Sequence, residues 1–313
     1  MAPRRESSYA RDATVHIETG SSPTVALDRA LEASDFLTSV DLARAAGGRP
    51  PDRFRIAIKP NLVSEAGTDP ALVEHLIRRL RERSYTDLTL VESRVEAGRG
   101  VLELAAAAGY SAQGYRIVDL SDEQVAFDYG GVLGQATAGR TWVEADYRLS
   151  FAKAKTRRRC FYSATLANVF GCLPRPDKLT SYAGPRHAYY ECCVLVADRL
   201  PVHFGVVDAW QGVDARSAGR RQLGEILASV NPFALDWVVG EKMELDPSLN
   251  PVLQEALLRW GRIHVTREGN VTAWAPWSNV RPITVAGLEL LEPLYRGPLR
   301  RFGGRRLSAW TVQ

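Results

Sequence analysis

Residues 54–91 read FRIAIKPNLVSEAGTDPALVEHLIRRLRERSYTDLTLV, a stretch in which two short apolar runs flank a helical pattern. The first run, Phe54 to Ile58, and the last, Leu88 to Val91, are rich in β-forming residues. Between them, Asp69-Pro70 is a typical helix start, because aspartate can cap exposed N–H groups and proline fits the first helical position. Apolar residues then recur at helical spacing. The stretch therefore predicts a βαβ unit with two parallel strands.

The same alternation of apolar runs and helical patterns continues along most of the chain. It predicts further strands at residues 115–118, 147–151, 204–207, 225–228, 263–266 and 271–274. It predicts further helices at residues 101–108, 161–169, 189–199, 232–242 and 252–260. Because strands that alternate with helices are typical of α/β proteins, we expect an α/β fold with a mostly parallel sheet and flanking helices.

The length of 313 residues allows one large domain or two, and we expect two lobes with a central crevice. The first α/β lobe is expected at residues 1–130, the second, with a basic loop, at residues 131–290, and a basic C-terminal tail at residues 291–313. Four glycines between Phe127 and Gly139 indicate this boundary, although a glycine-rich β-hairpin explains them equally well. The composition, 45% hydrophobic and 24% charged, is that of an ordinary globular protein.

No membrane span or secretory signal is visible in the sequence. No run approaches the roughly 20 apolar residues that a span needs, and the charged N-terminus lacks an apolar core behind it. We therefore expect a cytoplasmic protein without membrane contact. The four cysteines, Cys160, Cys172, Cys192 and Cys193, form no CxxC pattern, so we interpret them as reduced packing residues.

No cofactor is evident from a motif. An iron–sulfur cluster needs cysteine runs such as CxxCxxC, and a phosphate-binding Walker loop needs GxxxxGK[ST]; the sequence contains neither pattern. A divalent metal held by Glu92, His187 and Asp208 stays open, although the spacing of these residues does not indicate one.

The net charge of +4 does not by itself indicate a nucleic-acid partner. Much of the charge lies in residues 296–306 and in the run Arg157 to Arg159. Nucleic-acid binders usually add a recognisable motif, and the sequence has no helix-turn-helix, zinc finger or ribonucleoprotein motif. We therefore expect a small anionic metabolite as the partner and not a nucleic acid, and we leave homo-oligomer formation open.

Polar side chains follow four of the predicted strands, at the point where each strand ends. In open parallel sheets, ligands bind outside the carboxyl ends of the strands. Each of these residues alone has an ordinary structural interpretation, such as a solvated lysine or a helix cap. The residues at the strand ends are Lys59, Asn61, Glu92, Lys153, Lys155 and Asp208. Together they predict a crevice that attracts phosphate or carboxylate groups.

The segment Lys153-Ala-Lys-Thr-Arg-Arg-Arg159 has the highest density of cationic residues. With Asn168 and Lys178 downstream, it predicts an anion cradle in which Thr156 and the N–H groups of a following helix assist the cations. An exposed basic loop is the alternative interpretation. His187, in a polar stretch just after this region, titrates near neutrality and suits general acid or base work.

The same residues resemble a bacterial and archaeal family catalogued as domain of unknown function three-six-two. The matching segments are Ile58-Lys-Pro-Asn-Leu62, Thr68-Asp-Pro70, Lys153-Ala-Lys-Thr156, Ala167-Asn-Val-Phe-Gly-Cys-Leu-Pro174 with Lys178, Val207-Asp208, and Ser229-Val-Asn-Pro-Phe-Ala-Leu-Asp236. The usual Lys-Thr-His of the family is Lys155-Thr156-Arg157 here, and an arginine cannot act as a base at neutral pH. The residues after Val207-Asp208 also depart from the usual Gly/Glu-rich pattern. The resemblance itself names no reaction.

These observations lead us to expect an enzyme that uses acid/base chemistry on a small carboxylated or phosphorylated metabolite, in the isomerase, epimerase or lyase class and in a biosynthetic role. The expected binding residues are Lys59, Asn61, Lys153, Thr156, Arg157, Asn168 and Lys178. The expected proton-transfer residues are Lys155, His187, Asp208 and Glu92. The alternative is a non-catalytic protein that binds a nucleotide, a nucleic acid or an acidic partner in the basic groove.

Overall fold

The computed structural model describes residues 9–62, 67–94, 100–157, 160–214, 219–274 and Trp277. Within these residues, a single nine-stranded sheet forms the centre of the molecule. Its strands are β1 (Asp12–Thr19), β2 (Ile56–Pro60), β3 (Leu88–Glu92), β4 (Arg116–Asp119), β7 (Tyr147–Arg157), β8 (Phe161–Ser163), β9 (Phe204–Asp214), β10 (Gly219–Ser229) and β11 (His264–Gly269). A separate hairpin pairs β5 (Gln124–Gly130) with β6 (Gly134–Gly139).

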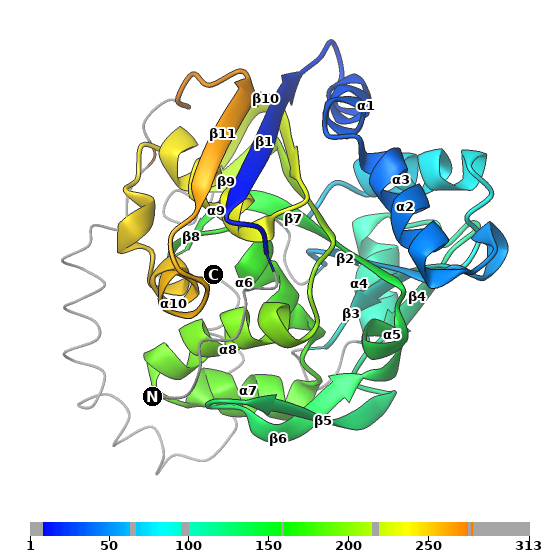
Figure 1. The fold of residues 1–313 in the computed structure, drawn as a ribbon, viewed down its shortest axis with the longest axis vertical. Coiled ribbons are helices and arrows are strands. Elements are labelled where there is room, and N and C mark those ends of the chain that lie inside the picture. The colour runs from blue at the N-terminus through cyan, green and yellow to red at the C-terminus, as the bar shows by residue number, and fades with distance from the viewer. Residues whose placement is uncertain are drawn as a thin grey trace.

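The strand order is β11-β1-β10-β9-β7-β2-β3-β4, with β8 paired to β7. The neighbours β9, β7, β2, β3 and β4 all run parallel, whereas β10 is antiparallel to both β9 and β1. In Figure 1 the blue strand β1 lies beside the orange strand β11, so the two ends of the described chain share one edge of the sheet. The predicted α/β fold with a mostly parallel sheet is confirmed.

Helices cover both faces of the sheet (Figure 1). They are α1 (Pro23–Ala33), α2 (Phe36–Gly47), α3 (Pro70–Glu82), α4 (Val101–Ala108), α5 (Arg140–Glu144), α6 (Thr165–Val169), α7 (Arg175–Ala183), α8 (Arg186–Arg199), α9 (Pro232–Lys242) and α10 (Pro251–Trp260), with short 3-10 turns at Pro51–Arg53, Phe170–Cys172 and Pro247–Leu249. Apolar residues of α1 to α4 form one core with one sheet face, and residues of α6, α8, α9 and α10 form a second core on the other face.

The βαβ unit predicted from residues 54–91 is present as β2, α3 and β3. Every residue of β2 and β3 is buried, and Ile56 is paired with Leu88 in parallel register. The Asp69 carboxylate accepts the N–H of Ala71 at 2.9 Å and so caps α3. The five buried apolar residues of this helix follow the helical spacing of the sequence. Short-range chemistry therefore determines this unit.

Two predicted elements are wrong. The helix expected at residues 161–169 begins only at Thr165, because residues 161–163 form β8 against the end of β7. The spacing of apolar residues cannot distinguish a short buried strand from the start of a helix, so the strand at residues 161–163 could not be predicted from the sequence. Residues 271–274 form no strand. The Lys242 ammonium donates to the carbonyl oxygens of Asn270 (2.8 Å) and Thr272 (2.5 Å), and these oxygens are the acceptors that strand pairing would need.

The glycine-rich segment 127–139 lies in the β5–β6 hairpin, one of the two interpretations that the sequence allowed. The division into two lobes at residue 130 stays a prediction, and the basic tail from residue 291 lies outside the described residues. Three elements at residues 12–47, namely β1, α1 and α2, had no counterpart in the sequence analysis. In the described part of the chain, no helix has the length and apolar character that crossing a bilayer requires.

Candidate functional site

The carboxyl ends of β2, β3, β7 and β9 meet at one edge of the sheet. Parallel pairing places Lys59 of β2 opposite Ser150 of β7, and Lys153 of β7 opposite Asp208 of β9. Because β7 and β9 continue beyond the end of β2, their polar residues extend past this edge. The predicted convergence of the strand ends is observed.

Lys59 and Glu92 form a buried ion pair at this edge. The Lys59 ammonium donates to Glu92 Oε2 at 2.8 Å, to the carbonyl of Pro60 at 2.7 Å and to Asn168 Oδ1 at 3.3 Å. Both charged residues are only 1% exposed. A buried charge is tolerated only when it is paired and its remaining hydrogen-bonding positions are filled. All three donor positions of the ammonium are occupied, so this lysine has a structural partner at every hydrogen.

A second buried lysine, Lys178 of α7, shares the same carboxylate. Its ammonium donates to the carbonyl of Ser93 at 2.8 Å and lies 3.7 Å from Glu92 Oε1. Burial lowers the pKa of Lys178 to about 8; the Glu92 charge opposes this effect, and the Lys59 charge adds to it. One carboxylate thus serves two lysines, which leaves a net positive charge at the edge of the sheet.

Asn168 is held in place by a cap that comes from another helix. Its side-chain amide donates to the carbonyl of Lys59 at 2.8 Å and to Ser150 Oγ at 3.0 Å. Asn168 lies on α6, whose first N–H groups, at Thr165 and Leu166, donate to the Asp236 carboxylate at 2.6 and 3.1 Å. Asp236 of α9 therefore performs for α6 the role that an N-cap residue usually performs within its own helix.

The ionisation of Asp236 should make stability depend on pH. Burial raises the pKa of Asp236 to about 7, although the two N–H donors oppose this effect. The folded state therefore holds this proton more tightly than the unfolded chain, and the stabilisation from the proton is complete below about pH 4 and lost as pH rises through about 7. We expect Asp236→Asn to flatten the change in free energy of unfolding between pH 4 and pH 8. Urea unfolding at several pH values in this range measures the free energy of unfolding. If it changed equally with pH in the variant and in the wild type, the prediction would be contradicted.

Gly171 allows the backbone to pass against the Lys59–Glu92 pair. A Cβ atom at position 171 would lie 2.5 Å from Lys59 Cε and 2.7 Å from Glu92 Oε1. The Ser93 hydroxyl donates to the carbonyl of Gly171 at 2.8 Å and fixes this close approach.

We expect Gly171→Ala to cost about 1–3 kcal/mol of unfolding free energy, because an added methyl group in a packed site forces its neighbours to move. Thermal and urea unfolding measure this loss. Gly47→Ala is the matched control, because a Cβ atom at that helical position meets no atom within 4 Å. Equal stability of the two variants would show that the pair can shift to admit the methyl group.

Asp208 is fully buried, and three donors occupy its carboxylate. Lys153 Nζ donates to Oδ2 at 2.7 Å, the N–H of Asp69 donates to the same oxygen at 3.1 Å, and the N–H of Trp210 donates to Oδ1 at 3.1 Å. The carboxylate thus links β7 and β9 to the start of α3. These contacts favour a positioning role for Asp208 and Lys153.

Lys155 differs from the other lysines at this edge. Its side chain is half-buried, and in the described residues its ammonium makes no hydrogen bond and no ion pair. Burial lowers the pKa of Lys155 to about 7, and the charges of Arg157 and Lys59 lower it further, whereas Glu92 opposes them. An amine with a pKa lowered in this way accepts a proton or attacks an electrophile more readily at neutral pH than an ordinary lysine.

Arg157 and Thr156 flank this lysine on β7. The Arg157 guanidinium donates to the hydroxyl of Tyr189 at 2.9 Å and of Tyr182 at 3.3 Å, and within the described part of the chain it has no carboxylate partner. The Thr156 hydroxyl donates to Asp214 Oδ1 at 3.1 Å. Arg157 therefore adds a positive charge that no carboxylate balances, whereas Thr156 ties β7 to β9.

Lysine is rare in this chain, and its positions are informative. Of 40 basic residues only five are lysines. Four lysines are buried and lie within ion-pair distance of a carboxylate: Lys59, Lys153, Lys178 and Lys242, the last of which contacts Glu225 at 2.8 Å. Lys155 is the fifth. The surface charge is instead carried by arginines, many of which are paired with acids, as Arg83 is with Asp41.

A family model described as "Domain of unknown function (DUF362)" matches residues 56–241, which include every strand end of the site. The chain belongs to this family. The Synechocystis protein named "Thylakoid-associated protein sll1697" is 25% identical over 244 residues, which are 71% of this chain and 74% of that protein. The resemblance seen in the sequence is confirmed.

The DUF362 domain also resembles the structure of the lactate racemase apoprotein from Thermoanaerobacterium thermosaccharolyticum. The TM-score is 0.51 and the identity 12%, and the match covers 74% of this chain. The chain spans 57% of the length of that structure. At this identity the similarity shows the fold alone, and the fold is thus one that an enzyme uses.

The DUF362 chain does not bring His187 into this cluster. His187 is exposed at the start of α8. Burial and Glu191 raise the pKa of Glu255 on α10, whereas Arg259 and His187 lower it, so the charge of His187 acts on α10. The backbone of Asn61 exchanges hydrogen bonds with Thr68, which ties down the chain after β2. In the described residues, no three His, Cys, Asp or Glu side chains gather as a metal site requires.

A cavity of about 280 Å³ lies at the other ends of the strands, where β7 begins and where His203 precedes β9. His203 stacks on Tyr147 and accepts the N–H of Arg148 at 2.9 Å. Burial lowers the pKa of His203 to about 4, and the charge of Arg148 contributes, so the ring is neutral at physiological pH. Asp12 is the one charged residue of its lining, so this cavity does not suit an anion.

The DUF362 site contains residues that the sequence analysis missed, namely Ser93, Ser150, Gly171 and Asp236. Gly171 and Asp236 lie within segments that resembled the family, and that resemblance was the available signal for them. Ser93 directly follows Glu92 at the end of a predicted strand, but its contact with Gly171, 78 positions away, could not be predicted; Ser150 had no signal, because its contact is with Asn168, 18 positions away.

Proposed function

We propose that this DUF362 protein is an enzyme that transfers a proton at a carbon atom of a small carboxylated metabolite, in the isomerase, epimerase or lyase class. The observation that carries this proposal is Lys155, an amine at the carboxyl edge of the sheet that has no ion-pair partner in the described residues and a pKa lowered to about 7. A base with a pKa near the working pH is the most effective proton acceptor. The other four lysines lie in ion pairs with buried carboxylates.

The charges around Lys155 favour an anionic substrate. Arg157 and Lys59 lie close enough to lower its pKa, and Glu92 is the carboxylate that Lys59 and Lys178 share. A substrate carboxylate would neutralise this excess, and the same cations would stabilise negative charge that develops when a proton leaves the adjacent carbon. Proton abstraction next to a carboxylate is the step that this arrangement supports best.

The fold similarity supports the same reaction class by analogy. Lactate racemase, whose apoprotein has a similar fold, is an isomerase of a 2-hydroxy carboxylate. One fold serves many reactions, so this similarity guides the choice of substrates to test and does not decide between them. Small 2-hydroxy and 2-oxo carboxylates are therefore the first class to test.

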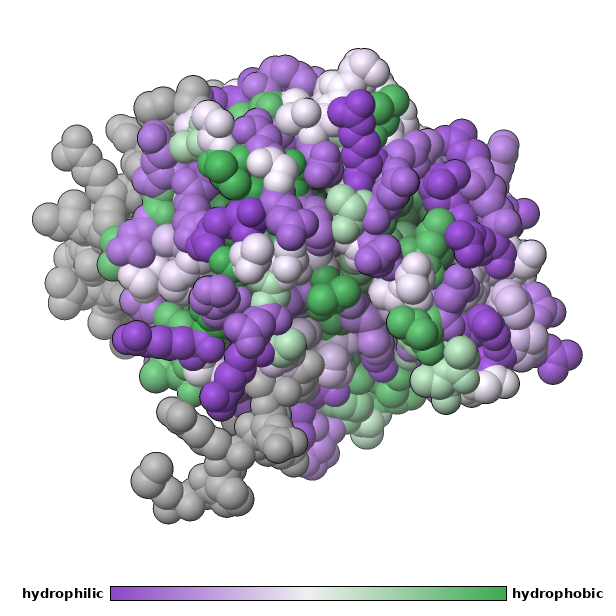
Figure 2. All heavy atoms as spheres, turned by 45° about the horizontal axis from the view of Figure 1, so that its top comes forward, coloured by the Kyte–Doolittle hydropathy of each residue, from purple (hydrophilic) through white to green (hydrophobic). Residues whose placement is uncertain are grey.

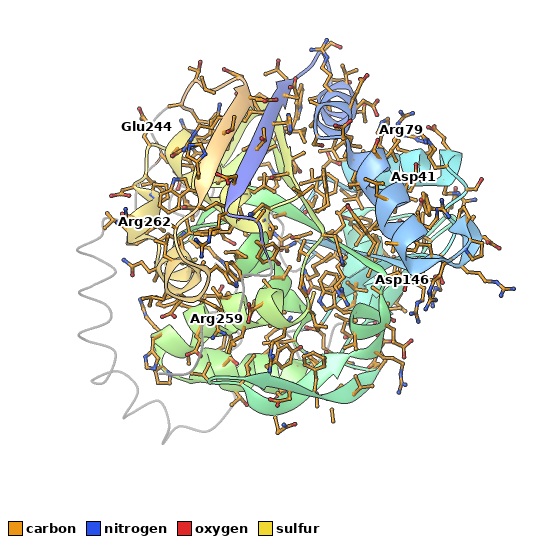
Figure 3. All side chains as sticks on the ribbon, in the orientation of Figure 1. Asp41, Arg79, Asp146, Glu244, Arg259 and Arg262 are labelled. Carbon is orange, nitrogen blue, oxygen red and sulfur yellow. The ribbon has the colours of Figure 1, made fainter. Side chains whose placement is uncertain are left out.

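The alternative, a groove for a nucleic acid or an acidic protein, has less support. Four of the five lysines are buried and cannot reach the backbone of a macromolecule. In Figure 3 the labelled charges Asp41, Arg79 and Asp146 lie at the periphery. Partly exposed arginines are paired with acids, as Arg79 is with Glu82 and Arg55 with Asp146. On the face in Figure 2, hydrophilic and hydrophobic residues are interspersed. These features favour a small ligand.

The proposal is tested in D₂O with L-lactate, pyruvate and other small carboxylates. Incorporation of deuterium next to the carboxylate, followed by NMR, is expected for a substrate, and binding should raise the unfolding temperature. Absence of both exchange and stabilisation for the whole series, with phosphorylated compounds included, would overturn the proposal. A loss of affinity that is steep in salt, without exchange, would favour the binding-protein alternative.

Arg157 should set the pH at which the enzyme becomes active. Its positive charge is, after burial, the first cause that lowers the pKa of Lys155 to about 7. Exchange by the wild type should rise with pH through about 7, because the unprotonated amine is the base. In Arg157→Gln this midpoint should move to higher pH, and KM for a carboxylate should increase. A pH profile of kcat/KM measures both, and an unchanged midpoint would exclude Arg157 from this role.

A further inference from the structure

We propose that the Lys155 amine forms a Schiff base with the carbonyl carbon of a small 2-oxo acid, so that the enzyme binds such acids covalently. This inference rests on the proposed function, because it uses the same site and the same carboxylate-binding cations. It names a narrower substrate class, compounds with a carbonyl group next to the carboxylate, and it adds a covalent step.

Lys155 differs from the other four lysines in its lack of a carboxylate partner in the described residues. Lys59, Lys153, Lys178 and Lys242 lie within 4 Å of a carboxylate, and each is at most 7% exposed. Carboxylates thus contact the nitrogen atoms of these four lysines, which leaves them less free to attack an electrophile. Lys155 has no such partner in the described residues, and its side chain is only partly buried.

Strand pairing on both sides holds the backbone of Lys155 in place. It lies within β7, between β8 and β9, and its backbone is in register with Ser163 on one side and with Val213 on the other. A strand with partners on both sides holds the base of the side chain still. The amine can therefore approach a bound carbonyl in a defined orientation, which is the main requirement for an addition reaction.

Burial and neighbouring positive charges also make the Lys155 amine more nucleophilic. A lysine becomes nucleophilic when it is desolvated or placed beside other cations. Both conditions apply to Lys155, whose pKa is lowered to about 7 by burial first and then by Arg157 and Lys59. In the described residues Arg157 donates to two tyrosine hydroxyls, which leaves N–H groups for the carboxylate of a 2-oxo acid. The carbonyl carbon would then lie next to the anion that Arg157 holds.

The step balances without an oxidant, a reductant or a metal. The lone pair of the unprotonated Nζ attacks the carbonyl carbon, a C–N bond forms, and the C=O π electrons move to oxygen, which takes up a proton. Loss of a proton from nitrogen and of the hydroxyl group as water then gives the imine, which protonates to the iminium ion. While the imine is present, the lone pair of Nζ is used in the C–N bond, so Lys155 acts as the nucleophile toward a 2-oxo acid and as the base toward an acid without a carbonyl group. Hydrolysis returns the amine and the carbonyl compound.

The test is reductive trapping on the full-length protein. Pyruvate and sodium borohydride are added together, because hydride reduces an iminium ion to a stable secondary amine. Intact-mass measurement should show one added group, and peptide mapping should place it on Lys155. The other four lysines serve as internal controls. An adduct at another lysine or at the N-terminus, in place of Lys155, would overturn the inference.

L-lactate is the matched ligand without a carbonyl group, and Lys155→Arg is the matched variant, since it keeps the charge but cannot form the imine. Neither combination should give an adduct, and the unfolding temperature of the variant should show that it is folded. If both acids stabilise the wild type but pyruvate gives no adduct, the Schiff base is refuted and the proton-transfer function stands. If neither acid stabilises the protein or undergoes exchange and no adduct forms, the inference fails together with the proposed function for this substrate class.

Discussion

Lys155→Gln is expected to lower proton exchange on the substrate by about 10²- to 10⁴-fold, the usual contribution of a general base. The variant should remain folded and as stable as the wild type, because in the described residues the Lys155 amine makes no hydrogen bond or ion pair that the change would break. Removal of an amine that other cations repel can even increase stability, since Arg157 and Lys59 both disfavour its charge. Deuterium exchange by NMR and urea unfolding measure the two effects separately.

Lys153→Gln is the matched control for this prediction. Lys153 lies two positions earlier on the same strand, but its ammonium contacts the buried Asp208 carboxylate at 2.7 Å. Its loss leaves that charge without a cation and should reduce the unfolding free energy by roughly 3–5 kcal/mol. Lys155→Gln should therefore lose proton exchange and keep its stability, whereas Lys153→Gln should lose stability. If Lys155→Gln lost stability and kept its activity, both the proposed base and the proposed function built on it would be refuted.

Glu92→Gln is expected to lose at least as much stability as Lys153→Gln. Its carboxylate contacts Lys59 at 2.8 Å and lies 3.7 Å from Lys178, and all three residues are at most 2% exposed. Glutamine has nearly the same shape but no charge, so two buried cations would lose their counterion. Breaking a buried pair by removing one partner costs roughly 3–5 kcal/mol, because the remaining charge is left in a medium that solvates it poorly.

Urea unfolding at pH 7 measures this loss, with Glu82→Gln as the control. Glu82 pairs with Arg79 on the surface of α3, where both side chains are exposed, and such pairs contribute about 0–1 kcal/mol. The difference between the two variants should narrow at high pH, where the pKa of Lys178, lowered to about 8, allows it to lose its proton. Equal losses at pH 7 would mean that the buried carboxylate does not balance the two lysines.

The accuracy of the sequence analysis followed the range of the interactions involved. The start of α3 was predicted because Asp69 caps an N–H group only two residues away. Likewise α9 begins at the predicted Pro232, since Asn231 accepts the N–H groups of Phe233 and Ala234. The extension of β7 to Arg157 was missed, because it depends on pairing with β8 and β9 and not on the residues of β7 alone.

The candidate site shows the same limit. Lys59, Glu92, Lys153 and Asp208 were correctly expected at one edge, because parallel strands present their carboxyl ends together. Their partners were not predicted: Lys59 and Asn168 are 109 positions apart, and Asn168 depends in turn on the cap from Asp236. The interpretation of His187 as a neighbour of the basic segment relied on closeness in the sequence, whereas α8 places its side chain in solvent near α10.

The sequence by itself determined the α/β class, the βαβ unit at residues 54–91 and the edge of the sheet at which the lysines gather, since periodicity, caps and strand ends depend on nearby residues. Only the tertiary structure decided which lysines have a carboxylate partner. Five lysines are chemically identical in the sequence, but parallel register and helix packing give four of them a carboxylate within 4 Å and leave Lys155 without one in the described residues. The pKa of an amine depends on burial and on charges that folding brings near it, so this difference exists only in the folded protein.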